Sequence, residues 1–333
     1  MRICIVGAGA IGGMIAARLA HVGHEVTVIV RGANLDAVRR NGGMKLIWED
    51  GTEILGPVRA TDSPAEAGTQ DCVILALKAH QLRPLLGQMP ALLAEHTSIV
   101  TMQNGIPFWY FHRHGGEYEG RTVESVDPGG ELIAALGAVR IIGSIVYPAS
   151  ELIAPGIVRH IEGNRFTLGE PDGSDSERIR AIAGAMRDAG FKAPISNDIR
   201  SEIWLKLWGN VIFNPVSALT HATLEDICRF PFTRELAAKV MAEAQAIGEK
   251  LGVKFKVSID KRIAGAEAIG AHKTSMLQDV EAGRALELDA LVGSVVEMGR
   301  ITGLPTPHID AVYACAKLLD KTLQDAKGRL QLG

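Results

Sequence analysis

Residues 2–13 read RICIVGAGAIGG, and this stretch decides the fold of the first half of the chain. A short apolar run, Arg2–Val6, leads into glycines at Gly7, Gly9 and Gly12, after which a helical pattern begins. The first glycine permits a tight turn, the second lets the backbone approach a pyrophosphate, and the third lets the helix pack closely on the strand. This order of strand, glycine spacing and helix predicts a dinucleotide-binding turn.

The start of the following helix is the second part of the predicted cofactor site. Backbone N–H groups of its first turn, including those of Ala10 and Ile11, are available to phosphates, and the helix dipole favours negative charge there. An NAD or FAD site usually has an acidic residue at the end of the second strand. Here Arg31 follows the strand predicted over 25–30, and a guanidinium suits a 2′-phosphate. We therefore expect NADP rather than NAD, and either rather than FAD.

The first 197 residues alternate strand-like and helix-like segments. Asp71–Leu77 is a continuous apolar run of the kind that is buried on both faces of a parallel sheet. The alternation predicts an α/β domain with a doubly wound sheet. Further expected elements are a hairpin over 44–60 with its turn at 49–51, helices over 80–94 and 175–189, and strands over 98–102 and 191–195.

From Asp198 onward the pattern becomes helical. This shift predicts two domains, a dinucleotide-binding domain over 1–197 and an all-α domain over 198–333. The length of 333 residues agrees with two domains of about 150 residues each. The expected helices cover 198–213, 222–228, 232–252, 258–282, 287–303 and 308–327.

Composition excludes several classes of protein. The chain has 35 lysine and arginine residues against 38 aspartate and glutamate residues, which does not favour nucleic-acid binding. No apolar run reaches the ~20 residues that a membrane-spanning helix needs, so we expect a soluble, cytoplasmic protein. The cysteines show no metal-binding spacing, and we expect buried thiols in a reducing compartment. They are Cys4, Cys72, Cys228 and Cys315.

Polar residues mark the carboxyl ends of two predicted strands and one face of a predicted helix. Lys78 and Asn104 follow the strands, at the edge where open α/β sheets bind ligands. Lys206, Asn210 and Asn214 are four residues apart within an otherwise apolar helix, so they share one face. A buried lysine is costly without partners, which indicates a polar cleft. We expect Pro215 to kink or end this helix.

A last cluster, between Thr274 and Asp289, contains Ser275 and Glu287. On one straight helix these two residues would lie about 18 Å apart and could not share a ligand. Gly283 offers a helix C-terminus between them. A turn at Gly283 and a new helix near Glu287 would let Ser275 and Glu287 converge.

Together these motifs resemble the ketopantoate reductase (2-dehydropantoate 2-reductase) family. The matching segments occur in the family's order and span most of the chain. They are GAGAIGG at 7–13, Arg31, LKA at 77–79, QNG at 103–105, KLWGNVIFNPVSAL at 206–219 and SMLQDVEAGRALELDAL at 275–291.

The resemblance implies a Rossmann-type domain followed by a helical domain like the C-terminal domain of 6-phosphogluconate dehydrogenase. It implies NADPH-dependent reduction of a 2-oxo acid to a 2-hydroxy acid, with ketopantoate and pantothenate biosynthesis as the first expectation. Lys206 would be the general acid, and Glu287 would bind a substrate hydroxyl and pair with the lysine region. The resemblance also implies binding roles for Asn210, Asn214 and Ser275 toward the substrate, for Lys78 toward the cofactor, and for Asn104 toward both.

The chain departs from typical family members over residues 107–131. This insert carries Phe108, Trp109, Tyr110, Phe111 and Tyr118. It could form a lid or wall for a bulkier substrate, or it could pack the domains or a subunit contact. Its two histidines, at 112 and 114, suit loop sequence better than a metal site, and we expect no metal.

Two other functions stay open at this point. One is a related NADP-dependent reductase or 2-hydroxy acid dehydrogenase for a bulkier substrate. The other is a non-catalytic NADP-binding sensor, which would need the glycine turn but would not need Lys206 and Glu287. The sequence leaves a homodimer possible without establishing one.

Overall fold

The computed structural model describes residues 1–328 and divides the chain into two compact units. The sheet unit contains most residues before Arg200, and the helical unit contains those from Arg200 onward. Two short segments of the first half, 104–106 and 123–128, belong to the helical unit. The sequence-based boundary after residue 197 lies close to this division but does not anticipate the two exchanged segments.

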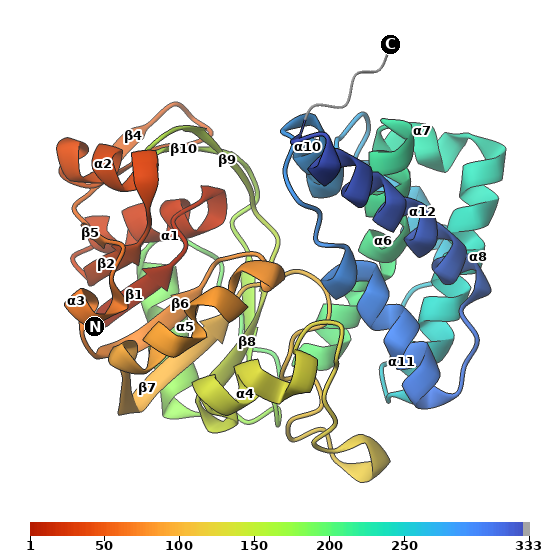
Figure 1. The fold of residues 1–333 in the computed structure, drawn as a ribbon, viewed down its shortest axis with the longest axis horizontal. Helices are drawn as coiled ribbons and strands as arrows, with labels where there is room; N and C mark the ends of the chain where they lie inside the picture. Colours follow the sequence, from red (N-terminus) through yellow and green to blue (C-terminus); the bar gives the residue numbers. More distant parts are fainter. Residues whose placement is uncertain (329–333) are drawn as a thin grey trace. The chain divides into compact units, whose positions relative to one another are not determined.

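A seven-stranded sheet forms the centre of the sheet unit (Figure 1). Its order is β11-β8-β7-β6-β1-β2-β5, with all neighbours parallel except β8 and β11. The order reverses direction at β1, which lies between β2 and β6, and this is the switch point of a doubly wound sheet. The expected fold is confirmed. The strands are β1 (Arg2–Val6), β2 (Glu25–Ile29), β5 (Arg59–Thr61), β6 (Gln70–Leu75), β7 (Leu93–Thr101), β8 (Ile141–Val146) and β11 (Phe166–Gly169).

A second, four-stranded sheet was not expected from the sequence. The hairpin of β3 (Met44–Ile47) and β4 (Glu53–Gly56) forms as predicted, but β3 also pairs in parallel with β10 (Ile157–Glu162). β10 pairs in turn with β9 (Ala149–Ala154). Helix α1 (Ala10–His21) packs against both sheets. A Cβ added at Gly13 would lie 2.6 Å from the Met44 side chain, which explains a glycine on the covered face of α1.

Several expected elements of the sheet unit are corrected. Residues 79–92 form two 3-10 segments, η1 (Ala79–Gln81) and η2 (Arg83–Leu92), because Pro84 and Pro90 remove donors that an α-helix needs. No strand forms over 191–195, where Lys192 and Ile195 make only isolated bridges. Pro194 has no N–H to extend the pairing.

The remaining helical segments of the sheet unit are α2 (Gly32–Asn41), α3 (Pro64–Ala67), α4 (Glu131–Leu136), α5 (Glu177–Asp188) and η3, η4 and η5 (Gly116–Tyr118, Pro128–Gly130, Ala138–Arg140).

The aromatic side chains of the insert are packed inside the protein. All five, Phe108, Trp109, Tyr110, Phe111 and Tyr118, are buried. The Trp109 indole donates a 2.8 Å hydrogen bond to Thr101 Oγ1, and a Cβ at Gly143 would meet its ring at 2.6 Å. These side chains therefore pack within the protein, and a role of the insert in shaping the substrate pocket stays a prediction.

The helical unit consists of helices joined by short turns, and no strand lies in its described residues. The helix expected over 258–282 is two helices, because Gly270 adopts a left-handed φ of +84° and Thr274 caps a new start. Pro215 does not end α6, which continues to Thr220 with its surroundings buried. The helical elements are α6 (Ile199–Thr220), α7 (Leu224–Arg229), α8 (Pro231–Lys250), α9 (Ile259–Glu267), α10 (Ser275–Glu281), the π-helical η6 (Asp289–Gly293), α11 (Ser294–Thr302) and α12 (Pro307–Asp325).

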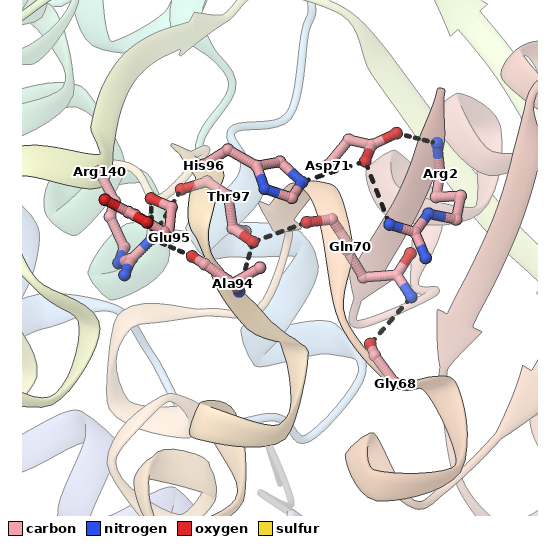
Figure 2. A network of polar contacts seen from close by, with 9 residues as sticks. All are labelled: Arg2, Gly68, Gln70, Asp71, Ala94, Glu95, His96, Thr97 and Arg140. Carbon is pink, nitrogen blue, oxygen red and sulfur yellow. Dashed lines mark hydrogen bonds and ion pairs between the residues drawn. The ribbon is translucent and has the colours of Figure 1, made fainter.

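Side-chain hydrogen bonds fix the amino-terminal ends of the central strands (Figure 2). Asp71 accepts from the Arg2 backbone N–H at 2.8 Å, and Thr97 Oγ1 donates to the Gln70 carbonyl at 2.6 Å. Arg140 donates to the carbonyls of Ala94 and Glu95. These contacts stabilise the sheet at the edge opposite the glycine turn. Open α/β sheets bind ligands at the other edge, where the strands have their carboxyl ends.

Three findings bear on the remaining expectations. Cys4, Cys72 and Cys228 are buried thiols, but Cys315 is exposed on α12, so the expectation of four buried cysteines is wrong at that position. Within residues 1–328, no helix is both long and apolar enough to cross a membrane. In the same range, histidine, cysteine, aspartate and glutamate side chains form no group of three that could hold a metal ion.

Candidate active site

The glycine turn has the geometry that a bound pyrophosphate requires. Gly7 has a φ of +99°, and its N–H donates to the Ile29 carbonyl at 3.0 Å. A Cβ on Gly12 would lie 1.9 Å from the Gly7 carbonyl oxygen, so only glycine allows α1 to approach β1 this closely. A Cβ on Gly9 would meet nothing within 4 Å. The space in front of Gly9 is therefore open to a ligand.

Helix α1 directs unsatisfied donors toward that space. Gly9 is the N-cap residue and has no side chain that could accept from the first turn, to which Ala10, Ile11 and Gly12 belong. Their N–H groups have no partners within the helix. The twelve-residue helix adds a partial positive charge at this end. The residues present thus fit a pyrophosphate group.

Arg31 lies at the carboxyl end of β2, in the place predicted for a 2′-phosphate contact. It is exposed, has extended backbone angles and is the N-cap residue of α2. Because β1 and β2 are parallel neighbours in register, Arg31 is on the same edge of the sheet as the glycine turn. Arg31 and the glycine turn therefore lie at the same edge of the sheet, and contact with a 2′-phosphate stays a prediction.

Lys78 also follows a strand at this edge. It comes three residues after β6, is half-buried, and is the N-cap residue of η1. Gln103, whose role the sequence did not reveal, fixes the chain beside it. The Gln103 amide nitrogen donates to the carbonyls of Leu75 and Leu77, at 2.8 and 3.0 Å. Gln103 thus holds the segment that leads to Lys78.

Three residues from distant parts of the sequence meet in the helical unit. Lys206 Nζ donates to Asn104 Oδ1 at 2.7 Å, and Asn104 Nδ2 lies 3.4 Å from Glu287 Oε2. All three side chains are half-buried. Asn104 therefore lies between the ammonium group and the carboxylate and contacts both.

The electrostatics of this cluster alter the titration of Lys206. Burial disfavours its charged form and lowers its pKa to about 8, while the Glu287 carboxylate acts in the opposite direction. A lysine with this pKa is mostly protonated near neutral pH and can still release its proton. These are the properties of a general acid for neutral pH.

Gly105 is the reason that Asn104 reaches the other two side chains. Its φ is +83°, and a Cβ there would lie 2.0 Å from the Ala290 carbonyl oxygen. The next residue, Ile106, donates its N–H to the same carbonyl at 3.0 Å. The segment 104–106 therefore pairs closely with Ala290 of the π-helical turn η6, three residues after Glu287. The sequence showed the Asn-Gly pair but not this partner.

The segment that carries Glu287 is fixed by α12. The Leu286 N–H donates to Asp320 at 3.0 Å. On the other side of Glu287, Asp289 accepts hydrogen bonds from Tyr313 at 2.6 Å and from Lys317 at 3.1 Å. As predicted, the chain turns at Gly283, which has a φ of +63°, and a new helical element follows Glu287.

The other predicted substrate residues have different positions. Because α6 is continuous from Ile199 to Thr220, Asn210 and Asn214 share the face of Lys206. Asn210 is half-buried and Asn214 is buried. Ser275 is exposed at the first position of α10. Its convergence with Glu287 stays a prediction.

Models of known families match both halves of the chain. The model described as "Ketopantoate reductase PanE/ApbA" matches residues 3–173, and the one described as "Ketopantoate reductase PanE/ApbA C terminal" matches residues 198–320. The chain belongs to the ketopantoate reductase family. The two matched ranges contain the glycine turn in one case and Lys206 with Glu287 in the other.

Individual relatives agree with this assignment. The chain is 56% identical to a curated 2-dehydropantoate 2-reductase from Mesorhizobium japonicum over 320 residues, which cover 96% of this chain and 98% of the relative. A crystal structure of a putative ketopantoate reductase from Ralstonia solanacearum has a TM-score of 0.92 at 42% identity, and covers 96% of this chain and 98% of that one.

A more distant structure shares the fold alone. D-mandelate dehydrogenase, solved with NADH and anilino(oxo)acetate, has a TM-score of 0.81 at 21% identity, over 97% of this chain and 99% of that one. This likeness shows a shared fold and assigns no substrate to this chain.

Proposed function

We propose that the protein reduces 2-dehydropantoate to pantoate with NADPH, a step of pantothenate biosynthesis. The observation that carries this proposal is the half-buried Lys206, held by Asn104 and close to the Glu287 carboxylate. The 56% identity to a curated 2-dehydropantoate 2-reductase over nearly the whole chain supports the substrate. NADPH, when bound, supplies a hydride to the keto carbon.

Lys206 is the group that we expect to act on the keto oxygen. Negative charge grows on that oxygen as the carbon is reduced, and a nearby ammonium group stabilises the charge and supplies the proton. Asn104 Oδ1 accepts a hydrogen bond from the Lys206 ammonium group at 2.7 Å. The Asn104 contact therefore orients the ammonium group.

Glu287 has two proposed roles. Its carboxylate favours the protonated form of Lys206, and it is suited to accept a hydrogen bond from the substrate's hydroxyl group. We assign substrate positioning to Asn210, Asn214 and Ser275, and cofactor binding to the glycine turn, Arg31 and Lys78. Asn104 is assigned to both functions.

The direct test is oxidation of NADPH, followed at 340 nm, with 2-dehydropantoate beside a panel of bulkier 2-oxo acids. We expect 2-dehydropantoate to be the best substrate, with kcat/KM of about 10⁴ M⁻¹s⁻¹ or more. Faster turnover of a bulkier 2-oxo acid would replace the substrate but keep the reaction class. NADPH binding without turnover of any acid would favour a sensor and contradict the proposal. A cytoplasmic location and a homodimer stay predictions.

Arg31→Ala tests the cofactor preference. The guanidinium matches a 2′-phosphate, which NADH lacks, so its loss should raise KM for NADPH by about tenfold or more. KM for NADH should change little. Arg40→Ala, which removes an exposed arginine farther along the same helix, serves as the control. Equal effects of Arg31→Ala on both cofactors would show that Arg31 does not contact the 2′-phosphate.

The pH dependence of kcat/KM should report the titration of Lys206. Only the protonated lysine can donate, so activity should fall above a pKa of about 8, by about tenfold per pH unit. Glu287→Gln removes the charge that raises this pKa, and the alkaline limb should move to lower pH. Glu281→Gln, at an exposed ion pair with Lys273, should leave the profile unchanged. An alkaline limb that stays at the same pH in Glu287→Gln would show that Glu287 does not influence the titration of Lys206.

A further inference from the structure

One side chain outside the predicted cofactor residues holds the glycine turn in place. Asn34, in the first part of α2, donates from Nδ2 to the Ala8 carbonyl at 2.8 Å. Its Oδ1 accepts from the Gly156 N–H at 2.6 Å. Gly156 lies in the turn between β9 and β10. Asn34 therefore joins three segments that are remote in the sequence.

The amide side chain of Asn34 satisfies both partners at once. The Ala8 carbonyl needs a donor and the Gly156 N–H needs an acceptor, and asparagine supplies one of each. Ala8 is 2% exposed, so its carbonyl has little access to water if Asn34 is lost. An aspartate at position 34 would keep the acceptor but bring a second oxygen toward the Ala8 carbonyl.

The second partner of Asn34 is itself held firmly. The Gly156 carbonyl accepts from the Lys45 N–H at 3.0 Å. A Cβ at Gly156 would lie 3.1 Å from the Asn41 amide nitrogen and 3.3 Å from Ala37 Cβ, so the turn lies directly against α2. The small sheet thus holds the Gly156 turn in place. Asn34 links this turn to the Ala8 carbonyl of the glycine turn through its two hydrogen bonds.

The consequence for the cofactor follows from peptide geometry. The Ala8 carbonyl and the Gly9 N–H belong to one planar peptide group and point in opposite directions. A hydrogen bond that holds the carbonyl therefore also sets the direction of the Gly9 N–H. Gly9 is the residue with open space in front of it and the N-cap of α1. In a dinucleotide-binding turn, the second glycine is the one whose backbone approaches the pyrophosphate.

We propose that Asn34 is a positioning residue for dinucleotide binding, which acts by fixing the Ala8–Gly9 peptide group. The inference rests on the dinucleotide cofactor of the proposed function. Because the pyrophosphate is common to NADPH and NADH, the role of Asn34 predicts an equal gain in affinity for both. A contact with the 2′-phosphate would favour NADPH alone.

The test is a measurement of Kd for NADPH and for NADH, by fluorescence titration of the full chain. Asn34→Asp should raise both Kd values by the same factor, about tenfold, because it replaces a donor to a buried carbonyl with an acceptor. Asn41→Asp adds the same charge to the same helix without a bond to Ala8, and should change neither value. Asn34→Ala removes both bonds without adding charge, and should also raise both Kd values equally.

Each other outcome has a defined meaning. An increase confined to NADPH would show a charge effect at the 2′-phosphate and overturn the positioning role. Unchanged Kd values with a lower melting temperature would show that Asn34 only stabilises the fold, and would overturn it as well. If Asn34→Asp does not fold, Asn34→Ala decides between these results. Failure of the wild-type protein to bind either dinucleotide would instead overturn the proposed cofactor.

Discussion

Lys206→Met is expected to lower kcat by about 10²- to 10⁴-fold, the usual contribution of a positioned general acid. Methionine has a similar length and no proton to donate, so the chemical step loses both the proton and the positive charge near the keto oxygen. NADPH binding should stay within about twofold of the wild type, since the glycine turn lies in the other unit. The measurement pairs steady-state kcat with Kd for NADPH.

The same variant should fold but lose some stability. Lys206 is desolvated beside Glu287, and removing one partner of such a pair leaves the other charge without compensation. Lys239→Met, at an exposed pair with Glu235, is the matched control and should keep wild-type kcat. Wild-type turnover in Lys206→Met would remove the lysine from the mechanism. A low kcat together with lost NADPH binding and no cooperative thermal unfolding would point to misfolding instead.

Local sequence predicted the sheet unit well where one segment determines its own structure. β1, the glycine turn and α1 form a continuous stretch in which the apolar run, the turn residues and the helix agree. The small sheet was missed because β3 pairs with β10, more than 100 residues later in the sequence. Such pairing depends on the packing of α1 between two sheets, and the local sequence of β3 or β10 does not show this packing.

The helix boundaries predicted from the sequence are wrong where side-chain burial and local helix propensity favour different structures. Pro215 costs a hydrogen bond in α6, yet buried residues on both sides of it, including Phe213 and Val216, hold the helix together. Over 79–92 the prolines determine the result. Two of them lie in a segment with little burial, and the α-helix does not form.

The candidate site was predicted as residues but not as a geometry. Lys206 and Glu287 came from motifs, and the family resemblance implied that Glu287 pairs with the lysine region without placing Asn104 between the two side chains. Asn104 is 102 residues from Lys206 and 183 from Glu287, and its place between them depends on Gly105 packing against Ala290. Asn34 carried no sequence signal, since an asparagine early in a helix is common.

Gly12→Ala and Gly9→Ala should separate the structural and binding roles of the glycine turn. A Cβ at Gly12 would lie 1.9 Å from the Gly7 carbonyl oxygen, so α1 would have to move away from β1. Such overpacking costs about 1–3 kcal/mol, occasionally more. We expect a melting temperature lower by about 3 °C or more, together with weaker NADPH binding. Thermal denaturation and fluorescence titration measure the two effects.

Gly9→Ala should do the reverse, because its Cβ would meet no protein atom within 4 Å and its φ of −76° suits any residue. The melting temperature should stay unchanged, while the methyl group enters the space of the pyrophosphate and raises Kd for NADPH by about tenfold or more. Gly265→Ala, in α9 with open space around it, is the control for NADPH binding, which it should leave unchanged. Unchanged NADPH binding in Gly9→Ala would place the pyrophosphate elsewhere, since a ligand that approaches the Gly9 backbone must collide with a side chain at that position.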